Sequence, residues 1–319
     1  MPAETAPPHG PYGFLGPEGS FAHAAAQALA GGAELVSHAS VAEAVDAVRA
    51  ATVAGAVVPL ENSVEGSVPA TLDELAELTG RSPLVIAAET YLPVVFDLLA
   101  RPGTRPAGIA AVATHPHAAA QVRRYLLTQL PGATVIPVAS TAGGAQAVAE
   151  GRYDAAVAPA AAGRRYGLDS LAHDIADNPG AVTRFVLLRV PSAPPPPTGN
   201  DRTTLVAYPR DDHAGALLEI LTEFATRGVN LTRIESRPTK AELGQYCFSI
   251  DCEGHVCQAR VGDALAALRR ICAEVRYLGS YPRSDGAVGR LGEVLSGRAD
   301  TDFSQAAGWL ARIRATGAG

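Results

Sequence analysis

The chain has 319 residues, of which 47% are hydrophobic and 18% are charged, a composition typical of a globular protein. This length exceeds one ordinary core and predicts roughly two or three domains. The formal net charge is -6, and no block of basic residues accompanies it, so the electrostatic footprint of a nucleic-acid-binding protein is missing. We therefore expect a small-molecule ligand and no nucleic-acid partner.

The N-terminal residues 1–13 are rich in proline and contain neither a basic stretch nor an apolar run, unlike a signal peptide. No apolar run approaches the ~20 residues that span a bilayer. We therefore expect a cytoplasmic protein with no membrane partner. Four cysteines form no C-x-x-C pair and are expected to be free thiols, with metal binding as a minor alternative. They are Cys247, Cys252, Cys257 and Cys272.

Short apolar runs alternate with amphipathic stretches from Tyr12 to about Val190. The apolar runs predict strands at 12–15, 34–37, 55–59, 84–92, 111–114, 134–138, 155–158 and 185–190. The amphipathic stretches predict helices at 21–30, 41–51, 68–78, 117–130, 141–150 and 159–166. This alternation predicts a mostly parallel sheet with helices on both faces, in one large domain or in two lobes.

Consecutive prolines at 194–197 mark a semi-rigid linker. Beyond it the order changes to strand, helix, strand, strand, helix and strand, which is the ferredoxin-like pattern. These elements are expected at 203–208, 215–227, 231–237, 245–251, 261–271 and 275–281.

The tail from Arg283 onward is rich in glycine and arginine, with one short helix expected at 303–313 and Asp302 as its N-cap. The expected role of this helix is to pack its apolar residues on a neighbouring surface, and a disordered tail is the alternative. Those apolar residues are Phe303, Trp309, Leu310 and Ile313.

Polar loops follow several of the predicted strands. The turn at 16–21 lies between a strand and a helix, where free backbone N–H groups can receive an anion, although a plain tight turn explains it equally well. In the loop at 59–68, Asn62 and Ser63 are suited to a polyoxygenated acid. Ser67 of the same loop is a candidate helix N-cap, and both interpretations can hold together.

Two further loops repeat this theme. His115 and His117 follow a strand, with Gln121 on the helix after them, and two histidines without a third ligand make a poor metal site. Ser140 and Thr141 again join a strand to a helix. Because the loops lie at strand ends, we expect them to converge on one crevice.

The last of these loops leads into Thr183, Arg184 and Phe185, which present a hydroxyl, a guanidinium and an aromatic ring in succession. They stand at a loop-to-strand junction, a common position for functional residues. The simpler interpretation is a solvated edge charge beside the start of a strand. Convergence with the other polar loops favours a functional site.

These motifs make the chain similar to the prephenate dehydratases from Tyr12 to about Arg283. The resemblance rests on seven motifs in the family's order. Five are the segments 16–21, 59–63, His115-Pro116 with Gln121, Ser140-Thr141 and Thr183-Arg184-Phe185; the others are Gly-Ala-Leu-Leu at 215–218 and Glu-Ser-Arg-Pro at 235–238, as in ACT regulatory domains. The sequence departs from the usual pattern at Ser20, His117 and Ala214.

The resemblance implies an α/β catalytic region at 12–190, with two lobes in a type 2 periplasmic-binding-protein-like arrangement and the active site in the cleft between them. A linker at 191–201, a ferredoxin-like ACT domain at 202–283 and a tail at 284–319 would follow. The ACT domain would pair with its copy in a homotetramer or dimer and bind L-phenylalanine as allosteric ligand. The residues implied in that binding are Gly215, Ala216, Leu217, Leu218, Asn230, Glu235, Ser236 and Arg237.

The implied reaction is the conversion of prephenate to phenylpyruvate in L-phenylalanine biosynthesis, by a monofunctional hydro-lyase that needs no cofactor and no metal. We expect Thr183 to assist the leaving hydroxyl, Arg184 to hold a carboxylate, and Phe185 to exclude water or pack on the ring. The residues expected to orient the dianion are Asn62, Ser63, Gln121, Ser140 and Thr141. The alternatives are a solute-binding receptor, a catalytically silent amino-acid sensor and, closest of all, an arogenate dehydratase.

Overall fold

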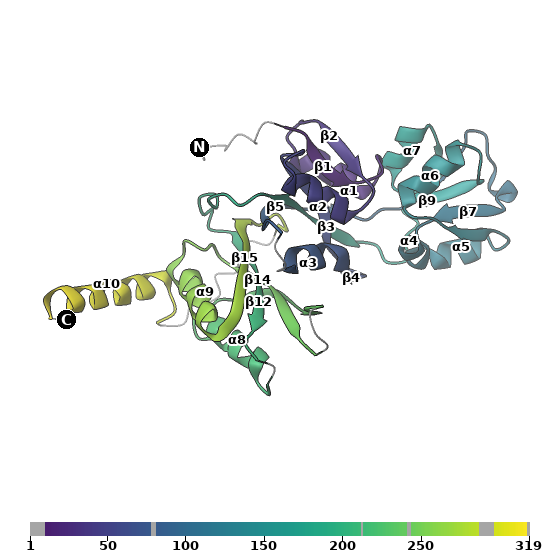
Figure 1. The fold of residues 1–319 in the computed structure, drawn as a ribbon. Helices are drawn as coiled ribbons and strands as arrows, with labels where there is room; N and C mark the ends of the chain where they lie inside the picture. The colour runs from purple at the N-terminus through teal and green to yellow at the C-terminus, as the bar shows by residue number, and fades with distance from the viewer. Residues whose placement is uncertain (1–9, 78–80, 212, 241–243, 287–296, 318–319) are drawn as a thin grey trace. The chain divides into compact units, whose positions relative to one another are not determined.

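The computed structural model describes residues 10–77, 81–211, 213–240, 244–286 and 297–317 (Figure 1). The chain divides into two units. The first contains Met1–Thr71 and Thr90–Leu188, and the second contains Leu72–Glu89 and Arg189–Gly319.

The first lobe of the first unit is built on a mixed sheet with the strand order β2-β1-β3-β11-β5. Strand β1 pairs in parallel with β2 and β3, whereas β11 runs antiparallel to β3. Fully buried side chains such as Phe14, Val57 and Leu60 hold the sheet against its helices. The elements are β1 Tyr12–Leu15, α1 Phe21–Leu29, β2 Leu35–His38, α2 Val41–Arg49, β3 Gly55–Asn62, β4 Gly66–Ser67 and β11 Val182–Arg189. Helix α3 Pro69–Ala76 and strand β5 Val85–Pro93 lie mostly in the segment 72–89 of the second unit.

The second lobe has its own sheet, in the order β10-β6-β9-β7-β8. Strands β7, β8 and β9 are parallel, so the loops that leave them lie at one edge. Helix α6 lies so close to this sheet that a Cβ on Gly144 would stand 2.9 Å from the carbonyl oxygen of Ala113. The elements are β6 Asp97–Ala100, η1 Pro106–Gly108, β7 Ala111–Thr114, α4 Pro116–Gln121, α5 Arg123–Gln129, β8 Thr134–Pro137, α6 Thr141–Ala149, β9 Ala155–Ala158, α7 Ala160–Tyr166 and β10 Asp169–Ala172.

The C-terminal domain is an antiparallel sheet in the order β13-β14-β12-β15, with a β-α-β-β-α-β chain order. Its core includes the fully buried residues Leu205, Phe224, Ile250 and Leu268. The elements are β12 Asp201–Pro209, α8 Ala216–Ala225, β13 Leu231–Pro238, β14 Tyr246–Glu253, α9 Ala259–Ile271 and β15 Cys272–Pro282. Two α/β lobes followed by a ferredoxin-like domain confirm the predicted fold class.

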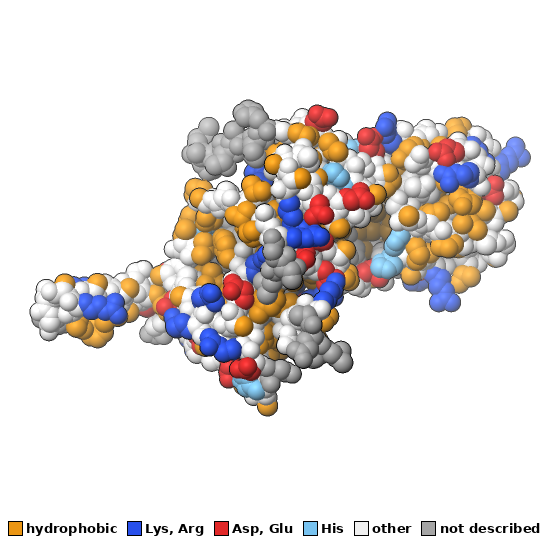
Figure 2. Space-filling model, viewed as in Figure 1, with side chains coloured by type: hydrophobic (Ala, Val, Ile, Leu, Met, Phe, Trp, Pro, Cys, Tyr) orange, Lys and Arg blue, Asp and Glu red, His pale blue; other side chains and the backbone are white. Residues whose placement is uncertain are grey.

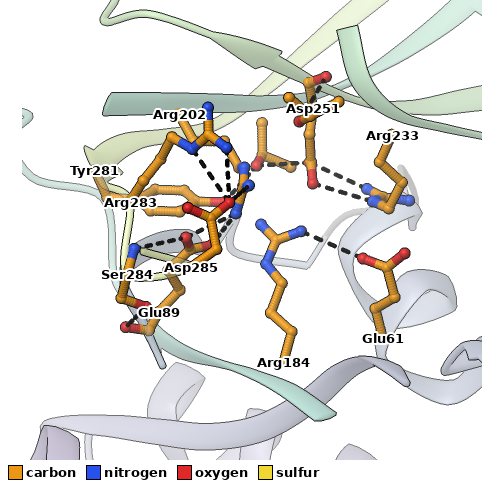
Figure 3. Close-up of polar contacts among 12 residues, drawn as sticks. Glu61, Glu89, Arg184, Arg202, Arg233, Asp251, Tyr281, Arg283, Ser284 and Asp285 are labelled. Carbon is orange, nitrogen blue, oxygen red and sulfur yellow. Dashed lines mark hydrogen bonds and ion pairs between the residues drawn. The ribbon is translucent and has the colours of Figure 1, made fainter. Parts of the chain in front are cut away.

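The segment 72–89 belongs with the C-terminal domain, although the sequence places it inside the catalytic region. Glu89 is fully buried and accepts hydrogen bonds from Nη1 of Arg202, at 2.7 and 2.5 Å, as Figure 3 shows. Asp73 accepts from Arg237 at 2.6 Å, and the guanidinium keeps the pKa of Asp73 low despite its partial burial. These contacts tie the segment to strands β12 and β13.

The tail helix is present as α10 Asp300–Thr316, but the predicted cap is wrong. Asp302 stands in the first turn, where its carboxylate accepts from the backbone N–H of Ala299 at 2.9 Å. Hydrophobic and basic side chains are both exposed along this helix (Figure 2). The exposed hydrophobic side chains include Trp309 and Leu310. Within the described part of the chain, no helix is long and apolar enough to cross a membrane.

Candidate active site

A hydrogen bond between two side chains of the first lobe joins the end of β3 to the start of β11. Thr183 lies opposite Asn62 in the antiparallel register. The side-chain Nδ2 of Asn62 donates to Oγ1 of Thr183 at 2.8 Å. Two of the predicted site residues, 121 positions apart in the sequence, therefore lie in direct contact.

The orientation of the Asn62 amide follows from its other contacts. Its Oδ1 accepts from the backbone N–H groups of Val64 at 2.8 Å and Glu65 at 3.0 Å. Because these two groups can only donate, the amide nitrogen has to face Thr183. The Thr183 oxygen thus accepts from Asn62, and the Thr183 hydroxyl hydrogen remains to be donated elsewhere.

Arg184 follows Thr183 on β11, so strand alternation sends the side chains of Thr183 and Arg184 to opposite faces of the sheet. In the strand register Arg184 lies opposite Glu61. The guanidinium is only 2% exposed, and its Nη1 lies 3.7 Å from Oε2 of Glu61 (Figure 3). Phe185 is buried beyond a bulge in the strand pairing. Ser63 accepts from the N–H of Val182 at 2.9 Å, which fastens the loop to β11.

In the second lobe the predicted residues lie at the ends of helices. The Ser140 oxygen caps α6 by accepting from the N–H of Gly143 at 3.0 Å, and Thr141 is the first residue of that helix. His115 caps α4 through Nδ1, which accepts from the N–H of His117 at 3.3 Å. Gln121 ends α4 and is nearly buried.

The two lobes of this unit meet at carboxylates that the sequence analysis did not select. Glu65 accepts from Nε2 of Gln121 at 3.2 Å, and its other oxygen lies 3.7 Å from Nδ1 of His117. Glu18 pairs with Arg165 at 2.5 Å. Glu65 could have been selected from the sequence, because it lies in the loop 59–68, which its polar residues had already marked as a candidate site.

Burial favours neutral imidazoles at the edge of each lobe. It lowers the pKa of His115, with the neighbouring His117 acting in the same direction and Glu65 opposing. Burial is also the main cause of the lowered pKa of His23, whose Nδ1 accepts from the N–H of Gly19 at 3.0 Å. Only a neutral ring can accept in this way.

Several predicted effector residues line a cavity of about 1010 Å³ in the C-terminal unit. Those that line it are Gly215, Ala216, Leu217 and Ser236. The other predicted residues, Leu218, Asn230, Glu235 and Arg237, are not among the lining residues. Helix α3 adds Asp73 and Glu74 to the wall.

The comparison with protein families agrees with this arrangement. Residues 12–193 match the prephenate dehydratase model, which covers both lobes and the Asn62–Thr183 contact. This chain belongs to the prephenate dehydratase family. Residues 210–273 match the ACT domain model. The predicted family is therefore confirmed, and the chain is a lyase with a C-terminal ACT domain.

Two relatives match this chain over nearly their whole length. Prephenate dehydratase from Amycolatopsis methanolica is 48% identical over 303 residues, covering 94% of this chain and 97% of its own. The crystal structure of prephenate dehydratase from Arthrobacter aurescens in complex with L-Phe is 46% identical, with a TM-score of 0.87, covering 95% and 99% of the two chains.

A further similar structure is that of GqqA, described as a novel type of quorum quenching acylase. It is 31% identical with a TM-score of 0.77, covering 86% of this chain and 98% of its own. The prephenate dehydratase from Arthrobacter is similar over more of this chain and at higher identity.

Proposed function

We propose that this enzyme converts prephenate to phenylpyruvate and that Thr183 donates a hydrogen bond or a proton to the leaving hydroxyl. The observation that carries this role is the 2.8 Å hydrogen bond from Asn62 to the Thr183 oxygen. It sets the direction of the hydroxyl, so that the Thr183 hydrogen is directed away from Asn62. Loss of water and carbon dioxide leaves an aromatic ring, and aromatisation drives the reaction.

The main task of the protein is then to help hydroxide leave as water. General acid catalysis is typically worth about 10²–10⁴ in rate, so one well-placed donor has a large effect. A free threonine hydroxyl is a very weak acid, and Thr183 therefore acts by stabilising developing charge or through a relay. Asn62, Gln121, Ser140 and Thr141 orient the dianion, and Ser63 supports them by fastening its loop to β11.

Arg184 is proposed to bind a substrate carboxylate. Its guanidinium already lies beside Glu61, so binding involves an exchange or sharing of carboxylate partners. In Arg184→Lys, a raised KM with an unchanged kcat would assign this residue to uniform binding of substrate and transition state. A lower kcat would instead assign it to the transition state.

The test of the Thr183 role is turnover of prephenate by Thr183→Ala, with Thr183→Ser as the matched control. We expect the alanine variant to lose about 10²–10⁴-fold in kcat, and the serine variant to keep most of the activity because it retains the hydroxyl. Circular dichroism and thermal unfolding show whether each variant is folded. A kcat near the wild-type value in a folded Thr183→Ala variant would show that Thr183 takes no part in the chemical step.

We propose that L-phenylalanine inhibits the enzyme through the ACT domain. Support comes from the Arthrobacter relative, which was crystallised with L-Phe, and from the cavity at Gly215 and Ser236. The arogenate alternative differs in having an amine in place of the side-chain ketone. Product absorbance with prephenate and with arogenate, each with and without phenylalanine, distinguishes the two substrates and measures the inhibition.

We further propose a catalytic region at 12–190, a linker at 191–201, an ACT domain at 202–283 and a tail at 284–319. A homotetramer or dimer is supported by the exposed apolar side chains of Leu217, Leu218 and Ile234 on the ACT domain. A cytoplasmic location is supported by four unpaired cysteines, since reducing compartments keep thiols free. Cell fractionation tests the location.

A further inference from the structure

Glu65 contacts both of the amide side chains that are proposed to bind substrate. It lies in the turn between β3 and β4, next to Gly66, whose φ of +83° suits glycine. The backbone N–H of Glu65 donates to Oδ1 of Asn62 at 3.0 Å. One end of this residue therefore helps to set the orientation of the Asn62 amide in the first lobe.

The side chain of Glu65 reaches the second lobe. Its Oε1 accepts from Nε2 of Gln121 at 3.2 Å, and Gln121 is nearly buried at the end of α4. An ionised carboxylate can only accept hydrogen bonds. The nitrogen of the Gln121 amide therefore faces Glu65, and its oxygen points away from Glu65.

A carboxylate beside a dianionic substrate would be unfavourable without a structural role. Two like charges at hydrogen-bonding distance repel each other. The Nδ1 atom of His117 lies 3.7 Å from Oε2 of the Glu65 carboxylate. The geometry thus combines a charge that disfavours substrate binding with two contacts that fix the substrate-binding amides.

We propose that Glu65 is a positioning residue for the dehydration, because it fixes the orientation of the Gln121 amide in the second lobe. This inference rests on the substrate-binding roles proposed for Asn62 and Gln121. Glu65 does not touch the reacting hydroxyl itself; it acts through Gln121. Replacing its side chain leaves the backbone contact to Asn62 in place, so the Asn62–Thr183 contact serves as an internal reference.

The experiment is a double-mutant cycle of Glu65→Ala and Gln121→Ala, with kcat and KM measured on prephenate. Misplacing a binding group by about 1 Å can lower the rate about 100-fold, and we expect a loss of that order in kcat/KM for each single variant. The double variant should lose no more than the worse single variant, since both remove the same interaction. Glu65→Gln should recover much of the loss, because its amide oxygen still accepts from Gln121.

The matched control is Arg165→Ala, which removes another ion pair that joins the two lobes, with Glu18 at 2.5 Å. Among the described residues, Arg165 contacts neither Gln121 nor Asn62. We expect its kcat/KM to stay within about 3-fold of wild type. An equal loss in Arg165→Ala and Glu65→Ala would show that any contact between the lobes matters, and would overturn the positioning role.

Two other results would also overturn the inference. One is a multiplicative loss in the double variant, which would mean that Glu65 and Gln121 act independently. The other is a folded Glu65→Ala with wild-type kinetics. A different result, an active Thr183→Ala variant, would show that the role proposed for Thr183 is wrong. An inactive Thr183→Ala together with a multiplicative cycle would reject only the role of Glu65.

Discussion

The Asn62 amide determines which partner receives the Thr183 hydrogen. In Asn62→Asp the oxygen that accepts from Val64 and Glu65 is kept, but the nitrogen is replaced by a second acceptor. Thr183 would then donate to the aspartate instead of to the leaving group. We expect a loss of about 10²–10⁴-fold in kcat without loss of fold, measured on prephenate with thermal unfolding as the check.

The comparison variant for this prediction is Asn62→Ala, which removes the donor without adding an acceptor. It should be more active than Asn62→Asp, because its Thr183 hydroxyl is not drawn away from substrate. The reverse order of activities would show that the direction of this hydrogen bond is unimportant.

His23 makes the stability of the first lobe sensitive to pH. Its pKa is lowered from 6.5 mainly by burial, so the folded state favours the neutral ring. This contribution is fully present above about pH 6.5 and is lost as the pH falls through the lower pKa of the folded state. The melting temperature of His23→Gln should therefore fall less than that of wild type between about pH 7.5 and pH 5.

His213→Gln provides the opposite sign in the same measurement. The pKa of His213 is raised by its hydrogen bond to Glu219, so its contribution is present at low pH and lost as the pH rises. The His213→Gln replacement should therefore not reduce the fall in melting temperature on acidification. Equal slopes for His23→Gln and wild type would contradict the role given to His23.

At the scale of elements, the sequence predicted the strand ends that carry Asn62 and Thr183, because apolar runs and turn residues mark them. It could not predict that they pair, since the register joins positions 121 residues apart. Strand β10 was missed because Asp169 and Ser170 break its apolar pattern, and β6 was missed because it follows β5 after only three residues. The helix expected at 117–130 is divided into α4 and α5 at Val122, whose φ and ψ of -120° and 16° leave the helical region.

Two helical glycines give opposite predictions. Gly144 lies against β7, where an added Cβ would stand 2.9 Å from a backbone oxygen, so Gly144→Ala should destabilise the protein by about 1–3 kcal/mol. Gly308 in α10 has only the end of Arg312 within reach, at 3.8 Å. Gly308→Ala should be neutral or slightly stabilising, because alanine favours helix by up to about 1 kcal/mol. Denaturant unfolding of both variants measures the difference.

At the scale of the whole molecule, the exposed apolar side chains of the ACT domain are the basis for its assembly. Leu218 is 65% exposed on α8, and Ile234 is exposed on β13, the edge strand of its sheet. A charge at such a position opposes burial in an interface. Leu218→Glu should shift the enzyme toward smaller species in sedimentation velocity and leave the unfolding temperature of the subunit nearly unchanged.

An unchanged molar mass in Leu218→Glu would place the subunit contact elsewhere. Arg269→Glu is a suitable control, because Arg269 is an exposed residue of the same domain. The Arg269→Glu variant should leave the assembly as it is.

The chain passes between its two units three times, at 71–72, 89–90 and 188–189. Truncation within the linker would therefore not leave a self-sufficient catalytic fragment. It would remove Arg202, whose guanidinium donates to Glu89, together with the strands to which the segment 72–89 is tied. A polypeptide ending at residue 190 should accumulate in inclusion bodies or melt well below the intact enzyme. A chimaera that replaces the ACT domain of this enzyme would have to replace the segment 72–89 together with it.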